Sequence, residues 1–515
     1  MSQDGSDPLD RPHLQVRHKG LLTGAVMLAM TMQVLDTTIA NVALPHMQAT
    51  LGATQENISW VLTSYIIAVA VAIPLTGWLS SRIGMRRLLI GAVALFVIAS
   101  TLCGVAADLP SMVAFRLVQG IGGAFIGPLA QTIMLDINKP SDHPRAMSLY
   151  GMGVLIGPIV GPVLGGWLTE SFDWRWVFYI NVPLGILCLA LLWTLMPRAK
   201  NAGRPFDMFG WAMLAIALAA FQLVLDRGAH VDWFAATEIW IESGIALSAL
   251  WVFLIHGVTA RKPLIPMPVL RNATFMASML MTFIMGLVLM SSLALLPTML
   301  QGLFGYPVMT TGEILASRGT GMLLTIAITG RVLKFIDARL LVLAGFLIIA
   351  FSLHMMTGWT LDMDWRPVVT SGLVQGMGIG FVFVPLNVLA FSALAAEYRT
   401  DAASLFNLAR NLGSSVGVAL VSALLARNIQ VSHADLAAHV TPYNLPMDPT
   451  LLQALGVSGT SALAMVDGIV NQQAGMIAYL DDFHLVMLST ICVMPLLLLL
   501  RKPPKQGAAP PVLAE

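Results

Sequence analysis

Long apolar stretches separated by short polar segments dominate the sequence from about residue 21 to residue 500. Each stretch holds roughly 20 mostly apolar residues, the length that an α-helix needs to cross the hydrocarbon core of a bilayer, and the pattern repeats about 14 times. The segments between the stretches carry turn-forming residues, as in "RIGMRR" at 82–87 and "NKPSDHPR" at 138–145. The pattern therefore predicts an all-α polytopic membrane protein.

A weak internal repeat divides these spans into two halves. The stretch "GWLSSRIGMRRLL" (77–89) is echoed by "GRVLKFIDARLL" (330–341), and "QGIGGAFIGPL" (119–129) is echoed by "QGMGIGFVFVPL" (375–386). Two spans between the halves have no counterpart in either of them. Repeated halves on either side of a central site are a common plan for secondary transporters.

The repeat predicts an order of segments along the chain. We expect a cytoplasmic tail at 1–20, a six-helix half at 21–200, two additional helices at 201–260, a second six-helix half at 261–500 and a cytoplasmic tail at 501–515. Within the second half, the proline-containing segment 428–478 is expected to form a long, folded external loop.

Composition agrees with a membrane protein and excludes several other classes. The chain is 57% hydrophobic and 11% charged, with a mean hydropathy of +0.79, whereas soluble domains carry about 25% charged residues. Its net charge of +1, without a basic arm or zinc-ligand spacing, argues against a nucleic-acid partner. No G-x-x-x-x-G-K-[ST] loop is present, so we expect no nucleotide cofactor and an ion gradient as the energy source.

Basic residues cluster before the first span and in every second loop, for example at 82–87, 139–145 and 331–339. Because cytoplasmic loops carry an excess of lysine and arginine, this distribution predicts that both termini are cytoplasmic. We expect a multi-pass protein of the cell inner membrane.

One carboxyl group interrupts the first apolar stretch, "LDTTIANVALP" at 35–45. Asp36 at mid-membrane costs about 2.5–3.5 kcal/mol on insertion scales, so a compensating role is expected. Thr37 and Asn41 follow it at i and i+4 and share one helical face. One interpretation is a polar patch that binds neighbouring helices. The other is a carboxyl group that binds and releases a proton as its exposure alternates.

A second charged position lies in the fourth span, in "RLVQGIGGA" at 116–124. Arg116 and Gln119 are one turn apart, and the glycines after them permit close helix packing. Because a buried guanidinium keeps its charge, Arg116 must find a carboxylate, carbonyl groups or water. A purely structural tether between helices is the alternative to a role in proton transfer.

Five motifs in a fixed order resemble those of the major facilitator superfamily. They are "LDTTIANVALP" (35–45), "GWLSSRIGMRR" (77–87), "RLVQGIGGA" (116–124), "GPIVGPVLGGWL" (157–168) and "WRWVFYINVPLG" (174–185). The chain is similar to the fourteen-helix drug:proton antiporter branch, the EmrB/QacA-like proteins. The ending "NQQAGMIAYLDDF" (471–483) is closer to the EmrB type. The resemblance implies a major facilitator fold, with Asp36 and Arg116 as proton-coupling residues.

The resemblance also implies roles for two groups of small and basic residues. In the fifth span, the motif that marks exporters within the superfamily comprises Gly157, Pro158, Gly161, Pro162, Gly165 and Gly166. Tight helix packing is a sufficient physical explanation for it. The loop after the second span resembles the superfamily's cytoplasmic gate loop and comprises Gly77, Arg82, Gly84, Arg86 and Arg87. Ser81 stands at the usual acidic position, and the positive-inside effect alone explains the arginines.

The second half contributes three charges within apolar stretches: Glu313, Arg318 and Arg410. Arginines in hydrocarbon usually face a cavity or a partner, so these two either neutralise acids such as Glu313 or line a cavity for an anionic substrate. The candidate substrate cavity residues are Asn41, Gln119, Arg318, Arg410 and Glu313.

Together these features predict a proton-coupled exporter of hydrophobic small molecules that are weakly acidic or amphipathic. The resemblance to EmrB implies a periplasmic adaptor and an outer-membrane channel as partners. The alternatives are a QacA-like pump that exports amphipathic cations alone, and a membrane sensor with a transporter fold but no flux. No cluster of nucleophile, base and orienting group points to an enzyme.

Overall fold

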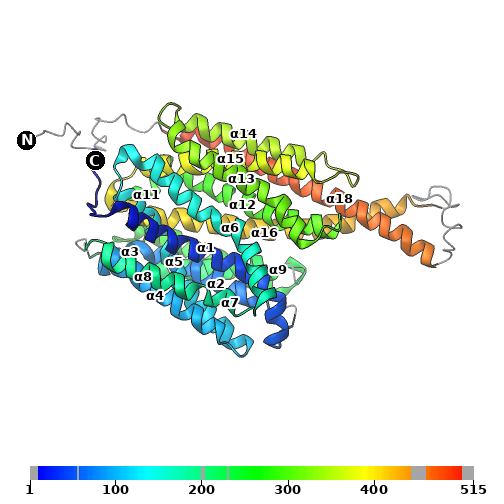
Figure 1. Cartoon of the computed structure of the whole chain (residues 1–515), viewed down its shortest axis with the longest axis horizontal. Helices are drawn as coiled ribbons and strands as arrows, with labels where there is room; N and C mark the ends of the chain where they lie inside the picture. The colour runs from blue at the N-terminus through cyan, green and yellow to red at the C-terminus, as the bar shows by residue number, and fades with distance from the viewer. Residues whose placement is uncertain (1–9, 55–56, 199–202, 229–230, 442–459, 502–515) are drawn as a thin grey trace, which may run out of the picture.

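A computed structural model describes residues 10–54, 57–198, 203–228, 231–441 and 460–501. Long helices, many of them running along the length of the molecule, make up the body (Figure 1). The prediction of an all-α membrane protein is confirmed. Thirteen helices within the described residues are long and apolar enough to cross a bilayer.

The first half consists of six spans. They are α1 (Lys19–Thr50), α2 (Trp60–Ala72) continued by η1 (Ile73–Leu75) and α3 (Thr76–Ile83), α4 (Met85–Gly104), α5 (Leu109–Asp136), α6 (His143–Ser171), which follows η2 (Pro140–Asp142), and α7 (Trp176–Tyr179) with α8 (Asn181–Leu195).

The second half follows the two additional helices. Those two are α9 (Met208–Gly228) and α10 (Thr237–Thr259), joined through η3 (Trp233–Ala235). The second half comprises α11 (Met267–Leu270), α12 (Ala273–Gly302), α13 (Val308–Val332), α14 (Ala338–Met356), α15 (Arg366–Ser392), α16 (Arg399–Ala438), which follows η4 (Ala396–Tyr398), and α18 (Thr460–Val493) with η5 (Met494–Leu499).

The predicted number of about 14 spans is not confirmed, because α13 is too polar to be counted with the thirteen. It has 25 residues, enough to cross a bilayer, but it contains Glu313, Arg318 and several threonines. This helix still packs on α6 and α15 inside the bundle. Its buried Arg318 faces α15, where it contacts Gln375, whereas Leu324 and Ile328 stay exposed.

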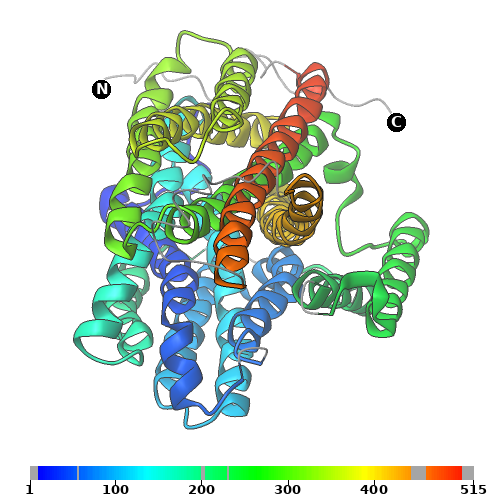
Figure 2. The ribbon, with the colours of Figure 1, turned by 90° about the vertical axis from the view of Figure 1, so that its right-hand side faces the viewer.

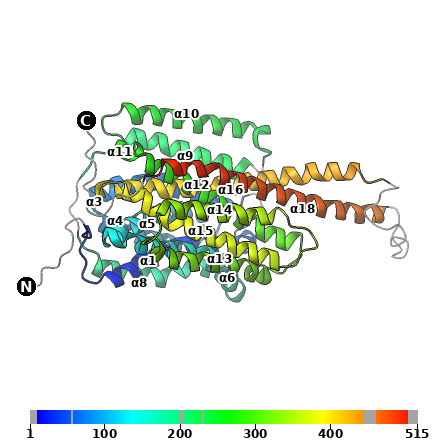
Figure 3. The ribbon, with the colours of Figure 1, turned by 90° about the horizontal axis from the view of Figure 1, so that it is seen from above.

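Figure 2 shows most of the first-half helices, in blue to teal, on the opposite side of the molecule from most of the second-half helices, in green to red. The pair α9 and α10 lies at one edge (Figures 2 and 3). Helix α10 packs on α9 and leaves large apolar side chains exposed, among them Trp240, Leu247 and Trp251. Such a surface suits contact with lipid.

The helices α16 and α18 extend beyond the rest of the bundle at one end (Figures 1 and 3). With 40 residues, α16 is about 60 Å long at 1.5 Å per residue, roughly twice the hydrocarbon thickness of a bilayer. Within the predicted external loop 428–478, residues 428–438 and 460–478 belong to these two helices. Residues 442–459 lie outside the described residues. We call the projecting parts of α16 and α18 the external hairpin.

Candidate functional site

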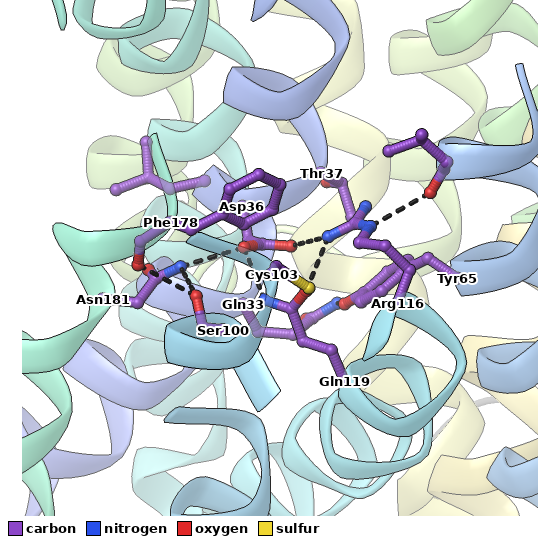
Figure 4. Close-up of polar contacts among 12 residues, drawn as sticks. Gln33, Asp36, Thr37, Tyr65, Ser100, Cys103, Arg116, Gln119, Phe178 and Asn181 are labelled. Atoms are coloured by element: carbon purple, nitrogen blue, oxygen red, sulfur yellow. Dashed lines mark hydrogen bonds and ion pairs between the residues drawn. The ribbon is translucent and has the colours of Figure 1, made fainter. Parts of the chain in front are cut away.

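Asp36 is buried in α1 and accepts three hydrogen bonds (Figure 4). Arg116 Nη1 lies 2.6 Å from Oδ2, Gln119 Nε2 lies 2.7 Å from Oδ1, and Asn181 Nδ2 lies 2.9 Å from Oδ1. The first two donors come from α5 and the third from α8. The carboxylate of α1 is therefore held by two other helices of the same half, α5 and α8.

Arg116 is fully buried and supplies the positive charge of this site. Its Nε donates to the carbonyl oxygen of Val61 at 3.0 Å, and its Nη1 also contacts Gln119 Oε1 at 2.8 Å. The guanidinium carbon lies 4.3 Å from the centre of the Tyr65 ring, a cation–π distance. Nη2 has no hydrogen-bond partner among the described residues. One buried donor next to Asp36 is thus open to a water molecule or a ligand.

An outer layer of polar groups orients these side chains. Asn181 Nδ2 also donates to Ser100 Oγ at 3.0 Å, and Ser100 Oγ donates to the carbonyl oxygen of Phe178 at 2.9 Å. Cys103 Sγ lies 3.6 Å from Gln119 Oε1. Such second-layer bonds fix the amides of Gln119 and Asn181 with their nitrogens toward the carboxylate, which is the arrangement that a negative charge requires.

The structure brings Asp36, Arg116 and Gln119 together but not Asn41, whose side chain is exposed on α1. Our sequence reasoning missed Asn181, Ser100 and Tyr65. Asn181 is a polar residue within an apolar stretch of the motif 174–185. That position was the one signal that pointed to it.

The second half contains a related site without an acid. Ser292 and Gln375 follow Asp36 and Gln119 by the same interval in the sequence. Gln375 Nε2 donates to Ser292 Oγ at 3.2 Å, and Arg318 Nη1 donates to Gln375 Oε1 at 3.1 Å. Serine therefore stands where the first half has its carboxylate.

Arg318 is buried, with 6% of its surface exposed, and its second contact is the carbonyl oxygen of Leu289 at 3.5 Å. Glu313, the acid considered as its partner, is exposed on the same helix. No ion pair within the described residues includes Arg318. The guanidinium of Arg318 donates hydrogen bonds to neutral oxygen atoms only. The second-half site therefore keeps a positive charge without a counter-ion.

A cluster of amides joins the two halves near the middle of the bundle. Gln131 on α5 donates to Asn387 on α15 at 2.5 Å, and Asn407 on α16 donates to Gln131 at 2.7 Å. Arg410 Nη2 donates to Asn407 Oδ1 at 2.6 Å, and Tyr150 on α6 donates to the same oxygen at 3.3 Å. Arg410 therefore lies at the interface of the halves.

Comparison with known proteins assigns this helical bundle to a family. The profile of the Major Facilitator Superfamily matches residues 26–418. The chain belongs to the major facilitator superfamily. It is 35% identical to the fatty acid resistance protein FarB of Neisseria gonorrhoeae, over 97% of this chain and 99% of that protein. It is 33% identical to the multidrug export protein EmrB of Haemophilus influenzae, over 90% of this chain and 92% of the relative. The EmrB-like branch is thereby confirmed.

Solved structures of the superfamily share the fold at low sequence identity. The human organic anion transporter MFSD10 matches with a TM-score of 0.59 and 13% identity, over 91% of this chain and 99% of that one. The proton:xylose symporter XylE matches with a TM-score of 0.58 and 14% identity, over 91% and 94%. Membership in this superfamily identifies the chain as a transporter rather than an enzyme.

The gate loop of this superfamily member lacks its usual acid at Ser81, whose hydroxyl donates to the carbonyl oxygen of Trp78. A negative charge reaches the same place from the second half. Asp401, in the first turn of α16, lies directly against the backbone of Gly77, where a Cβ atom would overlap its carboxylate. Arg204, in the segment before α9, contacts both carboxylate oxygens of Asp401 at 2.7 and 2.9 Å.

The other gate-loop residues have separate contacts. The Arg82 guanidinium lies 5.4 Å from the Trp78 ring centre, and Arg86 Nη2 donates to the carbonyl oxygen of Trp193 at 2.5 Å. Arg87 is exposed. Gly84 has a φ of +90°, a conformation that side chains rarely adopt, between α3 and α4. The loop thus forms a tight turn anchored by its arginines.

A second ion pair closes the same end of the molecule. Arg399 Nη1 on α16 lies 2.8 Å from Oδ1 of Asp136, and Asp136 is the last residue of α5. Both the first and last described segments lie at this end, since Leu14 donates to Asp136 and Arg501 donates to Thr274. We call the pairs Arg204–Asp401 and Arg399–Asp136 the latch. The two ion pairs therefore tie α16 to α5 and to the segment before α9 at the end that the basic residues predict to be cytoplasmic.

The exporter motif on α6 packs against α1 at the level of Asp36. A Cβ atom at Gly157 would overlap Val34, and one at Gly161 would overlap Thr38. Thr38 Oγ1 donates to the carbonyl oxygen of Gly157 at 3.2 Å. Pro158 and Pro162 lie inside a continuous helix, while Gly165 contacts Ile39 and Gly166 has open space around it. Any shift of α6 therefore displaces the part of α1 that carries Asp36.

Proposed function

We propose that this chain exports hydrophobic small molecules across the inner membrane in exchange for protons, with both termini in the cytoplasm. The observation that carries the proposal is the buried site at Asp36. Its carboxylate is neutralised by one arginine and oriented by two amides, so adding a proton removes the charge attraction that holds α1 to α5. Relatives named as export proteins support the direction of transport.

The proposed cycle couples this charge to the latch. Proton binding at Asp36 loosens the contact between α1 and α5, and α6 moves with α1 because of the glycine packing. The halves then rock around the amide cluster between α5 and α16, and the latch opens on the cytoplasmic side. Loss of the proton to the cytoplasm restores the ion pair and closes the latch again.

Transport into inside-out vesicles tests this function. A panel of fluorescent hydrophobic acids and cations is offered with and without a pH gradient that is acidic inside. We expect uptake of the acids that collapses when the gradient is dissipated. Uptake that is the same with and without the pH gradient would contradict proton coupling. Uptake of the cations alone would favour the stand-alone cation pump, and no uptake of either would favour a sensor.

The uncompensated charge of Arg318 supports weakly acidic substrates. Arg318 Nη1 and Nη2 have only an amide oxygen and a distant carbonyl as acceptors, so a carboxylate would supply the missing counter-ion. The relative FarB is named for resistance to fatty acids. We propose hydrophobic carboxylic acids as preferred substrates, with the acid group at Arg318.

Replacing Arg318 with Gln should weaken binding of a hydrophobic carboxylic acid about 10- to 100-fold, since hydrogen bonds to charged groups contribute about 1.5–3 kcal/mol. Binding of the corresponding primary amide should stay within about twofold. Both are measured by scintillation proximity or calorimetry on the purified protein. Arg427→Gln, an exposed arginine on α16, is the matched control. Equal losses for acid and amide would show that Arg318 is merely structural.

The external hairpin is the proposed contact for a periplasmic adaptor, which would lead to an outer-membrane channel. His433 on α16 contacts Asp467 on α18 at 2.8 Å and holds the two helices together beyond the bundle. Val431, Leu463 and Met465 remain exposed there. A water-exposed hairpin with apolar side chains suits binding to a helical partner.

Co-purification with a co-expressed periplasmic adaptor checks this contact. We expect co-elution with the unaltered chain and its loss in a Val431→Asp, Leu463→Asp variant. Leu247→Asn, on lipid-facing α10, controls for a general loss of folding. A chain that never co-elutes with an adaptor would favour a pump that works alone.

A further inference from the structure

Asp482 is a second buried carboxyl group that the mechanism above does not use. It lies in α18 with 0% of its surface exposed. Neither carboxyl oxygen has a hydrogen-bond partner among the described residues. Asp36, at the same degree of burial, has three donors. The two carboxyl groups therefore differ in the charge that they can hold.

The helices packed against α18 offer Asp482 no cation. These are α12, α14 and α16, with η5 at the end, and neither α12 nor η5 contains an ionisable residue. On α14, Arg339 pairs with Asp337 near the latch end, and His354 is exposed.

The charged groups of α16 are engaged or distant. Arg399 and Asp401 belong to the latch, and Arg410 contacts Asn407. Arg427 and Asp435 are both exposed. His433, on the external hairpin, contacts Asp467. On α18 itself, the ionisable neighbours are Tyr479, Asp481 and His484. Tyr479 donates its hydroxyl hydrogen to Thr298 Oγ1 at 3.1 Å, and Asp481 would repel a second negative charge.

A buried, ionised carboxylate without a protein donor or cation carries a desolvation cost that proteins avoid by binding a proton instead. We infer that Asp482 binds a proton in the closed conformation described here and forms a second proton site, in the other half of the transporter. This inference rests on the proposed proton coupling, and it assigns a role to an acid of the stretch 471–483, for which the resemblance implied none.

The position of Asp482 along α18 indicates the side of the molecule to which it is nearer. The next residue, Phe483, packs edge to face on Trp359 with ring centres 5.6 Å apart, and Trp359 lies just beyond the end of α14. One turn before Asp482, Tyr479 reaches Thr298 near the end of α12. Asp482 therefore lies toward the end of the bundle opposite to the latch. Because the latch joins helices at the predicted cytoplasmic end, we place the source of this proton on the other side.

Apart from the latch acids Asp136 and Asp401, each half then carries one buried carboxyl group among the described residues, Asp36 on α1 and Asp482 on α18. In the first half α8 packs on α1 and α4, and in the second half α18 packs on α12 and α14. Helix α18 thus takes the place of α8, which contributes Asn181 to the Asp36 site. The second half has Ser292 on α12 in place of Asp36, and its acid is on α18. Two sites predict two protons in each transport cycle.

Infrared difference spectroscopy of the purified protein in lipid, without substrate, tests the protonation state directly. We expect a carbonyl stretching band of a neutral carboxyl group near neutral pH. Asp482→Asn should remove this band, and Asp482→Glu should displace it. Asp481→Asn, at the exposed neighbour, should retain it. A wild-type spectrum that Asp482→Asn leaves unchanged would overturn the inference, whatever the transport activity.

Proton-to-substrate stoichiometry from reversal potentials in proteoliposomes tests the role in coupling. Asp482→Asn should transport with one proton fewer per substrate than the wild type, whereas Asp481→Asn should match the wild type. Asparagine keeps the shape and neutrality of a protonated aspartate, so the variant should fold and elute as a single species. An unchanged stoichiometry, or an aggregated Asp482→Asn variant beside a well-folded Asp481→Asn variant, would contradict the inference.

Discussion

Asp36→Asn is expected to abolish gradient-driven uptake into inside-out vesicles and to leave only passive exchange. Asparagine can accept the hydrogen bond from Arg116, but it cannot bind and release a proton. The charge that holds α1 to α5 therefore no longer alternates. Uptake is measured as accumulation of a fluorescent acid, with and without the pH gradient.

Two variants make this result specific. Asp36→Glu keeps a titratable group and should recover part of the uptake. Glu313→Gln removes an exposed acid of the second half and should behave like the wild type. Gradient-driven accumulation by Asp36→Asn at the wild-type level would remove Asp36 from the mechanism.

Arg116→Leu is expected to destabilise the protein strongly. Breaking a buried ion pair by removing one partner costs about 3–5 kcal/mol, because it leaves an uncompensated charge. Here that charge is Asp36, which keeps only the donors from Gln119 and Asn181. The midpoint of thermal unfolding in detergent should fall accordingly, and transport should be lost.

The double variant Asp36→Asn, Arg116→Leu should be more stable than Arg116→Leu alone, because no unpaired charge remains. A double-mutant cycle of the wild type, the two single variants and the double variant measures the coupling free energy between the two side chains. Additive effects of the two substitutions would mean that the ion pair does not contribute to the folded state. Transport should stay absent in the double variant, which separates folding from function.

Sequence reasoning reached the first-half site because each of its residues stands out in apolar surroundings. A carboxylate at Asp36 and a guanidinium at Arg116 are each costly in hydrocarbon, and the family resemblance implied a proton-coupling role for both. The length of the apolar stretches likewise predicted the helical class. Helical periodicity placed Asn41 on one face with Thr37, but it could not tell that this position is exposed on α1.

The features that were missed depend on contacts between distant segments. Asp401 and Arg204 lie in unremarkable polar loops of the sequence, where charged residues are normally solvated. Only the packing of α16 against Gly77 buries the carboxylate of Asp401 and brings it to the half-exposed Arg204. Asp482 was hidden in the same way, because "DDF" near the end of an apolar stretch does not tell which of the two acids faces inward.

Helix α16 carries residues of the latch, of the interface between the halves and of the external hairpin. The latch residues Arg399 and Asp401 lie in its first turn, Asn407 and Arg410 follow at the interface of the halves, and the external hairpin forms its far end. A tilt that opens the latch must swing the hairpin in the opposite direction, as a lever turns about its pivot. By thermodynamic reciprocity, a protein that grips the hairpin in one orientation also biases the opening of the gate on the other side of the membrane.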